Sequence, residues 1–261
     1  MAETYHKVAT KYSETRPSYP TEWFSQFASL TPRRSVAWDV GTGNGQAAIK
    51  LAEFYEKVYA TDISEEQLRE APSHPRIFYI HTPLSLSDDE IVSLVGGDNS
   101  VDLVTVATAV HWFDLEKFYS IVNRVLRKPE GIIAVWTYNI IRVSPEFDLV
   151  MQQFLNAAQR FLDPRVRYAF ENYETLPFPF ESVGLGYEGK PAVLEMKTEM
   201  SFEGMIELLG TWSATIVAKE QGEDLLHYKV VKEFEKVWGG PNVVKNVIYK
   251  TYIVAGKVCK V

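Results

Sequence analysis

The sequence has almost no cysteine, since Cys259 is the only one in 261 residues. No intrachain disulfide can form, and a zinc site built from several cysteines is excluded. This composition is typical of a reducing compartment, so we expect a cytoplasmic protein. The first residues lack a basic stretch followed by an apolar run, and we therefore expect no signal peptide. The most apolar stretch, 101–110, contains Asp102 and is too short to cross a bilayer, so no membrane span is expected.

Positive charge is also scarce, because 27 Lys and Arg stand against 34 Asp and Glu and give a net charge of -7. Nucleic-acid binding depends on a positive surface that displaces counterions, so this balance argues against a DNA or RNA substrate. The hydrophobic share of 46% is enough for a packed core. The length suits one α/β domain with an added cap. We expect a single domain over 1–261, with covering elements in 1–20 and roughly 139–191.

The first half of the chain alternates between short apolar runs and segments with helical spacing. The expected strands are 36–40, 57–61, 77–80, 101–107 and 132–136, and the expected helices are 46–55, a helix opening at Ser64, 88–95 and 115–126. Alternation at this spacing predicts a parallel sheet with right-handed crossovers. The strands are continuous apolar runs, which indicates that helices cover both faces of the sheet.

The second half changes character. Its expected elements are a long helix over 145–162, a strand over 193–200, helices over 202–209 and 223–237, and a final strand over 247–258. The stretch 163–191 is rich in aromatic residues, proline and glycine. We interpret this half as the end of the sheet together with a helical cap.

The clearest site signal is the segment 39–45, Asp-Val-Gly-Thr-Gly-Asn-Gly, between the first strand and the first helix. Glycines at such a turn let the backbone approach a ligand closely. The dinucleotide fingerprint would place its third glycine at Gln46, and a phosphate loop would need Lys followed by Ser or Thr. A carboxylate at Asp39 would repel a pyrophosphate and attract a cationic amino acid, such as the methionine half of S-adenosylmethionine.

Asp62 ends the second strand, 21 residues after Gly41. An acid at this place can accept hydrogen bonds from both ribose hydroxyls. The alternative is a plain tight turn with an acid near a helix cap, since Ser64 followed by Gln67 predicts a capping box. The glycines and the acid together favour a nucleoside cofactor.

Three motifs make the chain resemble the class I S-adenosylmethionine-dependent methyltransferases, and among them the trans-aconitate methyltransferase-like group of the methyltransferase type 11 family. The motifs are Tyr-x3-Arg-Pro-x-Tyr-Pro over 12–20, the glycine segment 39–45 with Asp62-Ile63-Ser64, and Ala-Thr-Ala-Val-His-Trp-Phe-Asp over 107–114. The match is good over 5–138 and weaker beyond. The resemblance implies a Rossmann-like α/β fold, whose seven-stranded sheet is mostly parallel with an antiparallel last strand, plus a helical cap.

The resemblance also implies S-adenosylmethionine as the cofactor, and we expect no metal. The implied cofactor-binding residues are Tyr12, Arg16, Asp39, Gly41, Thr42, Gly43, Asn44, Gly45, Asp62, Ile63, Ala107, His111 and Trp112. Asp39 and the glycines would face the methionine part, Asp62 would face the ribose, and the Arg16 region would fold over the cofactor. The stretch 81–84, His-Thr-Pro-Leu, departs from many relatives because it has no acid for the adenine amino group.

His111 leaves the fourth strand at the edge where a transferable methyl group would sit, so it is the candidate catalytic residue. It can serve as a base, as a donor to a carboxylate, or as a structural donor to the backbone. An ionised carboxylate acceptor needs no base, whereas a phenol or an amine would gain from one. Arg165 and Arg167 are the candidates for gripping a carboxylate, and a solvated charged surface is the alternative.

The resemblance thus implies a methyltransferase acting on a small molecule, with a carboxylic acid as acceptor and a methyl ester as product. The alternatives are an O- or N-methyltransferase of another small metabolite, and a cofactor-binding protein without turnover. A dinucleotide-dependent oxidoreductase is disfavoured by the glycine spacing. The sequence leaves open the identity of the acceptor and the choice between a monomer and a homodimer.

Overall fold

The computed structural model describes residues 17–258. The chain divides into two compact units. The sheet unit comprises Ser18–Asn139, Arg167–Leu194 and the residues from 251 onward, and the helical unit comprises Ile140–Val166 and Glu195–Lys250. The expectation of one domain over 1–261 stays a prediction.

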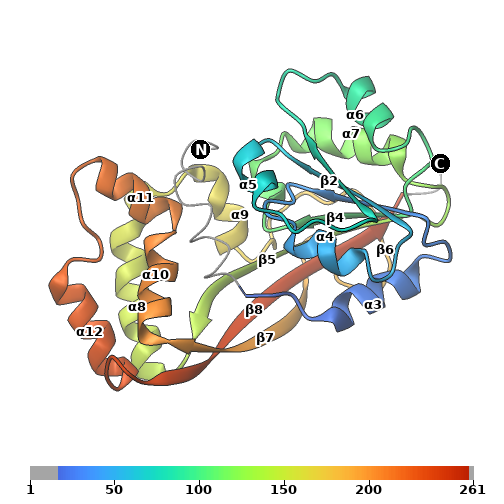
Figure 1. The fold of residues 1–261 in the computed structure, drawn as a ribbon. Helices are drawn as coiled ribbons and strands as arrows, with labels where there is room; N and C mark the ends of the chain where they lie inside the picture. The colour runs from blue at the N-terminus through green and yellow to red at the C-terminus, as the bar shows by residue number, and fades with distance from the viewer. Residues whose placement is uncertain (1–16, 259–261) are drawn as a thin grey trace. The chain divides into compact units, whose positions relative to one another are not determined.

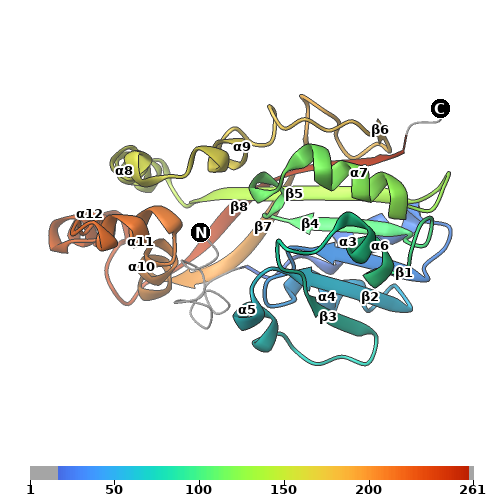
Figure 2. The ribbon, with the colours of Figure 1, turned by 90° about the horizontal axis from the view of Figure 1, so that it is seen from above.

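The strands form one eight-stranded sheet in the order β3-β2-β1-β4-β5-β8-β6, with β7 pairing with β8 outside this path (Figure 1). Their bounds are β1 Val36–Val40, β2 Lys57–Asp62, β3 Ile77–His81, β4 Leu103–Ala107, β5 Ile132–Arg142, β6 Glu181–Ser182, β7 Ala192–Ser201 and β8 Val244–Lys257. Figure 2 shows the first five strands side by side, from β5 to β3.

Neighbouring strands among β1 to β5 pair in parallel, and β6 pairs antiparallel with β8. The predicted Rossmann-like sheet, mostly parallel with an antiparallel end, is therefore confirmed. The sheet has eight strands where seven were expected, and the additional strand is β6, which has only two residues. Two residues are too few to show the alternation of polar and apolar side chains by which a strand is recognised in a sequence.

Helices cover both faces of the sheet. The helices of the sheet unit are α3 Thr21–Leu30, α4 Gln46–Leu51, α5 Glu65–Arg69, α6 Asp88–Leu94, α7 Leu115–Val125 and α9 Arg167–Phe170. Phe118 and Val122 of α7 share a core cluster with Val135 of β5. The next residue of β5, Trp136, points to the opposite face and stacks on Phe27 of α3 at 5.6 Å between ring centroids. This burial on both sides explains the continuous apolar runs.

A buried carboxylate holds the amino ends of β1 and β4 together. Asp102, just before β4, accepts hydrogen bonds from the backbone N–H groups of Ser35 and Val36, both at 2.9 Å. Arg127 Nε donates to the other oxygen of the same carboxylate at 2.6 Å. The charge of Asp102 is thus both paired and hydrogen-bonded, as a buried charge must be.

The helical unit contains α8 Pro145–Ala158, α10 Phe202–Gly210, α11 Ser213–Glu220 and α12 Tyr228–Trp238. Ser144 caps α8, since its side chain accepts the N–H of Phe147. The Phe147 ring then packs between α8 and α12, 5.5 Å from the Trp238 ring. Among the described residues, no helix has the length and apolar character needed to cross a membrane.

Candidate cofactor site

The loop after β1 depends on its glycines for two different reasons. Gly41, Gly43 and Gly45 have φ values of 65°, 58° and 83°, which side-chain-bearing residues rarely adopt. A Cβ on Gly41 would lie 2.8 Å from Ala109 Cβ, so this glycine is needed for packing. Around a Cβ on Gly43, chain neighbours aside, Gln67 Oε1 at 3.8 Å is the one atom within 4 Å in the part of the chain that the structure describes. Within that part, the Gly43 side of the loop is therefore open.

Asp39 is buried beside this loop, with 1% of its surface exposed. Its carboxylate accepts hydrogen bonds from Thr42 Oγ1 at 2.5 Å and from Thr105 Oγ1 of β4 at 2.7 Å. Burial raises the pKa of Asp39 to about 6, although the two hydroxyls oppose this shift and nearby Asp62 adds to it. A positive ligand group beside Asp39 would restore its full charge.

Asp62 joins the glycine loop to the end of β2. One carboxylate oxygen accepts the N–H of Gly43 and the other accepts the N–H of Ser64, each at 2.8 Å. The backbone N–H of Thr42 also donates to Thr61 O at 3.0 Å. The structure thus brings together the glycine turn and the acid that the sequence analysis assigned to one site.

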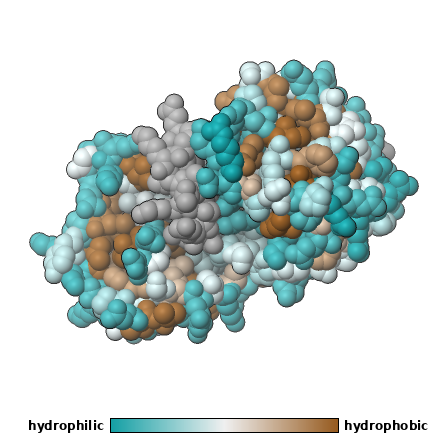
Figure 3. Space-filling view, viewed as in Figure 1, coloured by the Kyte–Doolittle hydropathy of each residue, from teal (hydrophilic) through white to brown (hydrophobic). Residues whose placement is uncertain are grey.

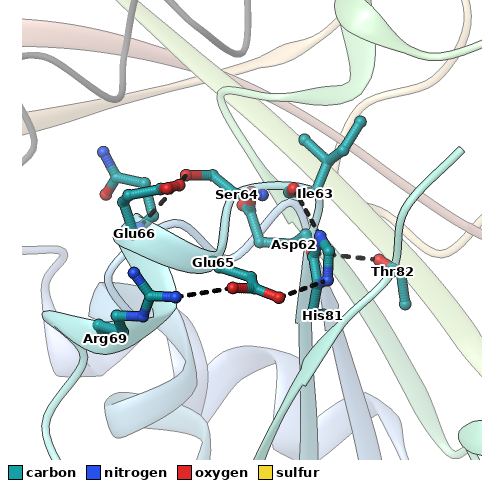
Figure 4. A network of polar contacts seen from close by, with 9 residues as sticks. Asp62, Ile63, Ser64, Glu65, Glu66, Arg69, His81 and Thr82 are labelled. Atoms are coloured by element: carbon teal, nitrogen blue, oxygen red, sulfur yellow. Dashed lines mark hydrogen bonds and ion pairs between the residues drawn. The ribbon is translucent and has the colours of Figure 1, made fainter.

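A second polar network lies behind Asp62, at the ends of β2 and β3 (Figure 4). His81 Nε2 is 3.0 Å from the carbonyl oxygen of Ile63, and its Nδ1 is 3.2 Å from Glu65 Oε1. Arg69 donates to the other oxygen of Glu65 at 2.7 Å. The N–H of Thr82 donates to Asp62 O at 2.9 Å. His81, the first residue of the stretch that lacks the usual acid, therefore braces the loop that follows Asp62.

Two apolar side chains are exposed in the same neighbourhood of the chain. Ile63 is 40% exposed and Leu84 is 88% exposed. Hydrophobic residues gather in patches between hydrophilic ones on the viewed face of the sheet unit, on the right of Figure 3. Exposed apolar side chains of this kind are available for contact with a flat ring.

The end of β4 is packed more tightly. After Ala107, Thr108 has a φ of 56°, a strained value for a β-branched residue. Its backbone N–H is held by Trp136 O at 2.7 Å. His111 lies in the short helical turn Val110–Trp112, is 5% exposed, and has its Nδ1 3.2 Å from Tyr173 Oη. Burial raises the pKa of the Tyr173 hydroxyl, so this partner stays protonated.

The chain is similar to known methyltransferases. The methyltransferase domain family matches residues 38–135. A solved structure from Anaeromyxobacter dehalogenans, described as a type II methyltransferase, is 35% identical, with a TM-score of 0.77. That match covers 93% of this chain and 97% of that one.

The chain belongs to the class I S-adenosylmethionine-dependent methyltransferases. Its cofactor is S-adenosylmethionine. A Dictyostelium discoideum protein named as a methyltransferase is 28% identical over 216 residues, 81% of this chain and 77% of that protein. A Saccharomyces cerevisiae protein named as an S-adenosylmethionine-dependent methyltransferase is 29% identical over 145 residues, 52% of this chain and 46% of that protein.

The predicted substrate arginines of this methyltransferase differ in their surroundings. Arg165 belongs to the helical unit and donates to both carboxylate oxygens of Asp163, at 3.0 and 2.9 Å. These bonds lower the pKa of Asp163 to about 2. Arg167 belongs to the sheet unit, where its guanidinium lies 5.1 Å from the centroid of the Tyr168 ring. Tyr12 and Arg16 lie outside the described residues.

Three residues that contact or border the predicted site residues were not themselves predicted as site residues. Thr105 is a polar residue inside the apolar β4 run, and this exception in the sequence could have indicated a polar contact there. Tyr173 contacts His111 from 62 positions away in the chain, which no local pattern indicates. Gln67 was assigned to a capping box with Ser64; the bond from its N–H to Ser64 Oγ forms, but its side chain borders Gly43.

Proposed function

We propose that this methyltransferase transfers a methyl group to the carboxylate of a small molecule and forms a methyl ester. The observation that supports a carboxylate acceptor is the burial of His111 and its contact with Tyr173. The histidine is buried and its Nδ1 faces a protonated hydroxyl of Tyr173, so the candidate base is engaged within the fold. A carboxylate is ionised at neutral pH and needs no base to act as a nucleophile.

The proposed cofactor contacts follow from the glycine loop. Gly41 to Gly45, with Thr42 and Asn44, would lie along the methionine part, and buried Asp39 would face its cationic amino group. Asp62 would accept from the ribose, while Ile63, Ala107 and Trp112 would line the remaining edge. When bound, S-adenosylmethionine supplies a methyl group on a positively charged sulfur.

Arg167 is the proposed anchor for the acceptor carboxylate. Its side chain is exposed, and it forms no ion pair within the part of the chain that the structure describes. Arg165 is the weaker candidate, because Asp163 already occupies its guanidinium. Placement in the trans-aconitate methyltransferase-like group is part of the same proposal.

The test is transfer of labelled methyl from S-adenosylmethionine to a panel of small carboxylic acids, phenols and amines. We expect labelled product from the acids, and we expect base to release the label as methanol, as methyl esters do. Replacing His111 with Gln should lower this turnover by less than about tenfold, since no base is required. Base-stable label on phenols or amines alone would overturn the ester proposal, as would loss of all turnover in the Gln variant while it still binds cofactor.

A further inference from the structure

Two helices of this chain begin with the same sequence pattern, and only one completes its capping box. At α6, Ser87 Oγ accepts the N–H of Glu90 at 3.3 Å, and the N–H of Ser87 donates to Glu90 Oε2 at 2.9 Å. At α5, Ser64 Oγ accepts the N–H of Gln67 at 3.3 Å. The N–H of Ser64 donates to Asp62, however, so the second half of the predicted box is absent.

Because the Ser64 amide donates to Asp62, the side-chain oxygen of Gln67 does not receive the hydrogen bond that a capping box would give it. The residue is 6% exposed, and its Oε1 is buried without a hydrogen-bond partner among the described residues. Buried polar atoms without partners are few in native proteins, and each calls for an explanation. A bound ligand that supplies a donor is one such explanation.

The position of this oxygen points to the ligand. Gln67 Oε1 borders the open side of Gly43, 3.8 Å from where a Cβ would lie. The N–H of the same glycine is bonded to the Asp62 carboxylate. A ligand lying over Gly43 would therefore meet two acceptors, the Asp62 carboxylate and the Gln67 carbonyl. The ribose presents two neighbouring hydroxyl donors, whereas the ammonium group of the methionine part is matched by Asp39.

We propose that Gln67 is a cofactor-binding residue, whose Oε1 accepts a hydrogen bond from a ribose hydroxyl of S-adenosylmethionine. This inference rests on the cofactor assignment and on the proposed ribose contact of Asp62. Asp62 takes the Ser64 amide, and Gln67 Oε1 is left with no donor among residues 17–258. The ligand supplies the donor that the capping box does not.

Calorimetric titration with S-adenosylhomocysteine tests the proposal without turnover. Gln67→Met and Gln67→Leu remove the acceptor and keep much of the side-chain volume, and we expect each to raise the dissociation constant about fivefold. Gln26→Met makes the same chemical change on the exposed surface of α3 and should leave binding unchanged. Thermal unfolding of the free Gln67 variants should occur at or above the wild-type temperature, because an unsatisfied oxygen is removed.

A second set of ligands identifies the donor. The Gln67→Met penalty should be the same for 5′-methylthioadenosine, which lacks the amino acid part. It should disappear for either the 2′-deoxy or the 3′-deoxy form of S-adenosylhomocysteine. A penalty confined to ligands with the ammonium group would overturn the ribose contact, as would unchanged affinity in both nonpolar variants. Absence of binding to the wild-type protein would instead overturn the cofactor assignment itself.

Discussion

The ends of β2 and β4 flank β1 in the same sheet, and they use their polar side chains in opposite ways. At the end of β2, the Asp62 carboxylate accepts hydrogen bonds from backbone amides. Among the described residues, the Gly43 side of the loop is open and the side-chain oxygen of Gln67 has no hydrogen-bond partner. At the end of β4, Ala109 closes on Gly41, and His111 is buried against Tyr173. In the proposed site, the first end receives the ligand, while the second packs against the glycine loop at Gly41.

The largest effect that distinguishes the two strand ends is expected from substitutions of Gly41 and Gly43. We expect Gly41→Ala to lower the free energy of unfolding by about 3 kcal/mol, because it adds a clash with Ala109 to an unfavourable φ. Gly43→Ala has the unfavourable φ alone and should cost about 1 kcal/mol. Denaturant unfolding measures both values. Equal losses would show that the Gly43 side is packed rather than open.

Asp62→Ala should weaken S-adenosylhomocysteine binding by about tenfold or more. The substitution removes charged hydrogen bonds, each worth about 1.5–3 kcal/mol, and releases the amide of Gly43. Calorimetry gives the dissociation constant, and thermal unfolding shows whether the variant is folded. An unchanged affinity in a folded variant would remove Asp62 from the ribose contact.

Asp39 should make cofactor binding depend on pH. Because its pKa in the free protein is raised to about 6, the carboxyl holds a proton below that pH. A cationic ligand group favours the ionised form, so binding releases this proton and affinity falls as the pH falls. The dissociation constant should be about tenfold lower at pH 7 than at pH 5. Asp39→Asn should flatten the profile, and a persisting slope would assign it to another group.

The smallest effect is expected at the end of β4. His111→Ala should change S-adenosylhomocysteine affinity by no more than about twofold, because the ring faces Tyr173. Tyr173→Phe should lower the free energy of unfolding by about 1 kcal/mol through loss of the shared hydrogen bond. Titration and denaturant unfolding check the pair. A large loss of affinity in His111→Ala would move the histidine into the cofactor site.

Much of the fold could be predicted because each parallel strand carries its own apolar run. The first four strands were located within two residues at either end, whereas the fifth, expected over 132–136, runs on to Arg142. The meeting of Asp62 with the glycine turn follows from parallel strands that end at one edge. The long helix expected over 145–162 ends at Ala158, and a turn of 3-10 helix continues to Phe161. Helix ends of this kind fray by one or two residues and are poorly encoded locally.

The features that could not be predicted depend on contacts distant in sequence. No local pattern near His111 indicates Tyr173, which lies 62 positions away. The half-formed capping box, by contrast, has a local cause, because Asp62 takes the amide of Ser64 only two residues later. The division into two units is likewise a property of contacts across the chain, which helical and strand periodicities do not report.

The clamp at Asp102 has a consequence for the far edge of the sheet. Side chains alternate along a strand, so a slip of β1 against β4 by one position would exchange Trp38 with Asp39 between core and site layers. Asp102 accepts the amide of Val36, the first residue of β1, and the amide of Ser35 just before it, and these bonds oppose that slip. The register of β1 against β4 is therefore fixed at the amino ends of these strands, so the sequence of the glycine loop at the opposite end of β1 can change without changing the register.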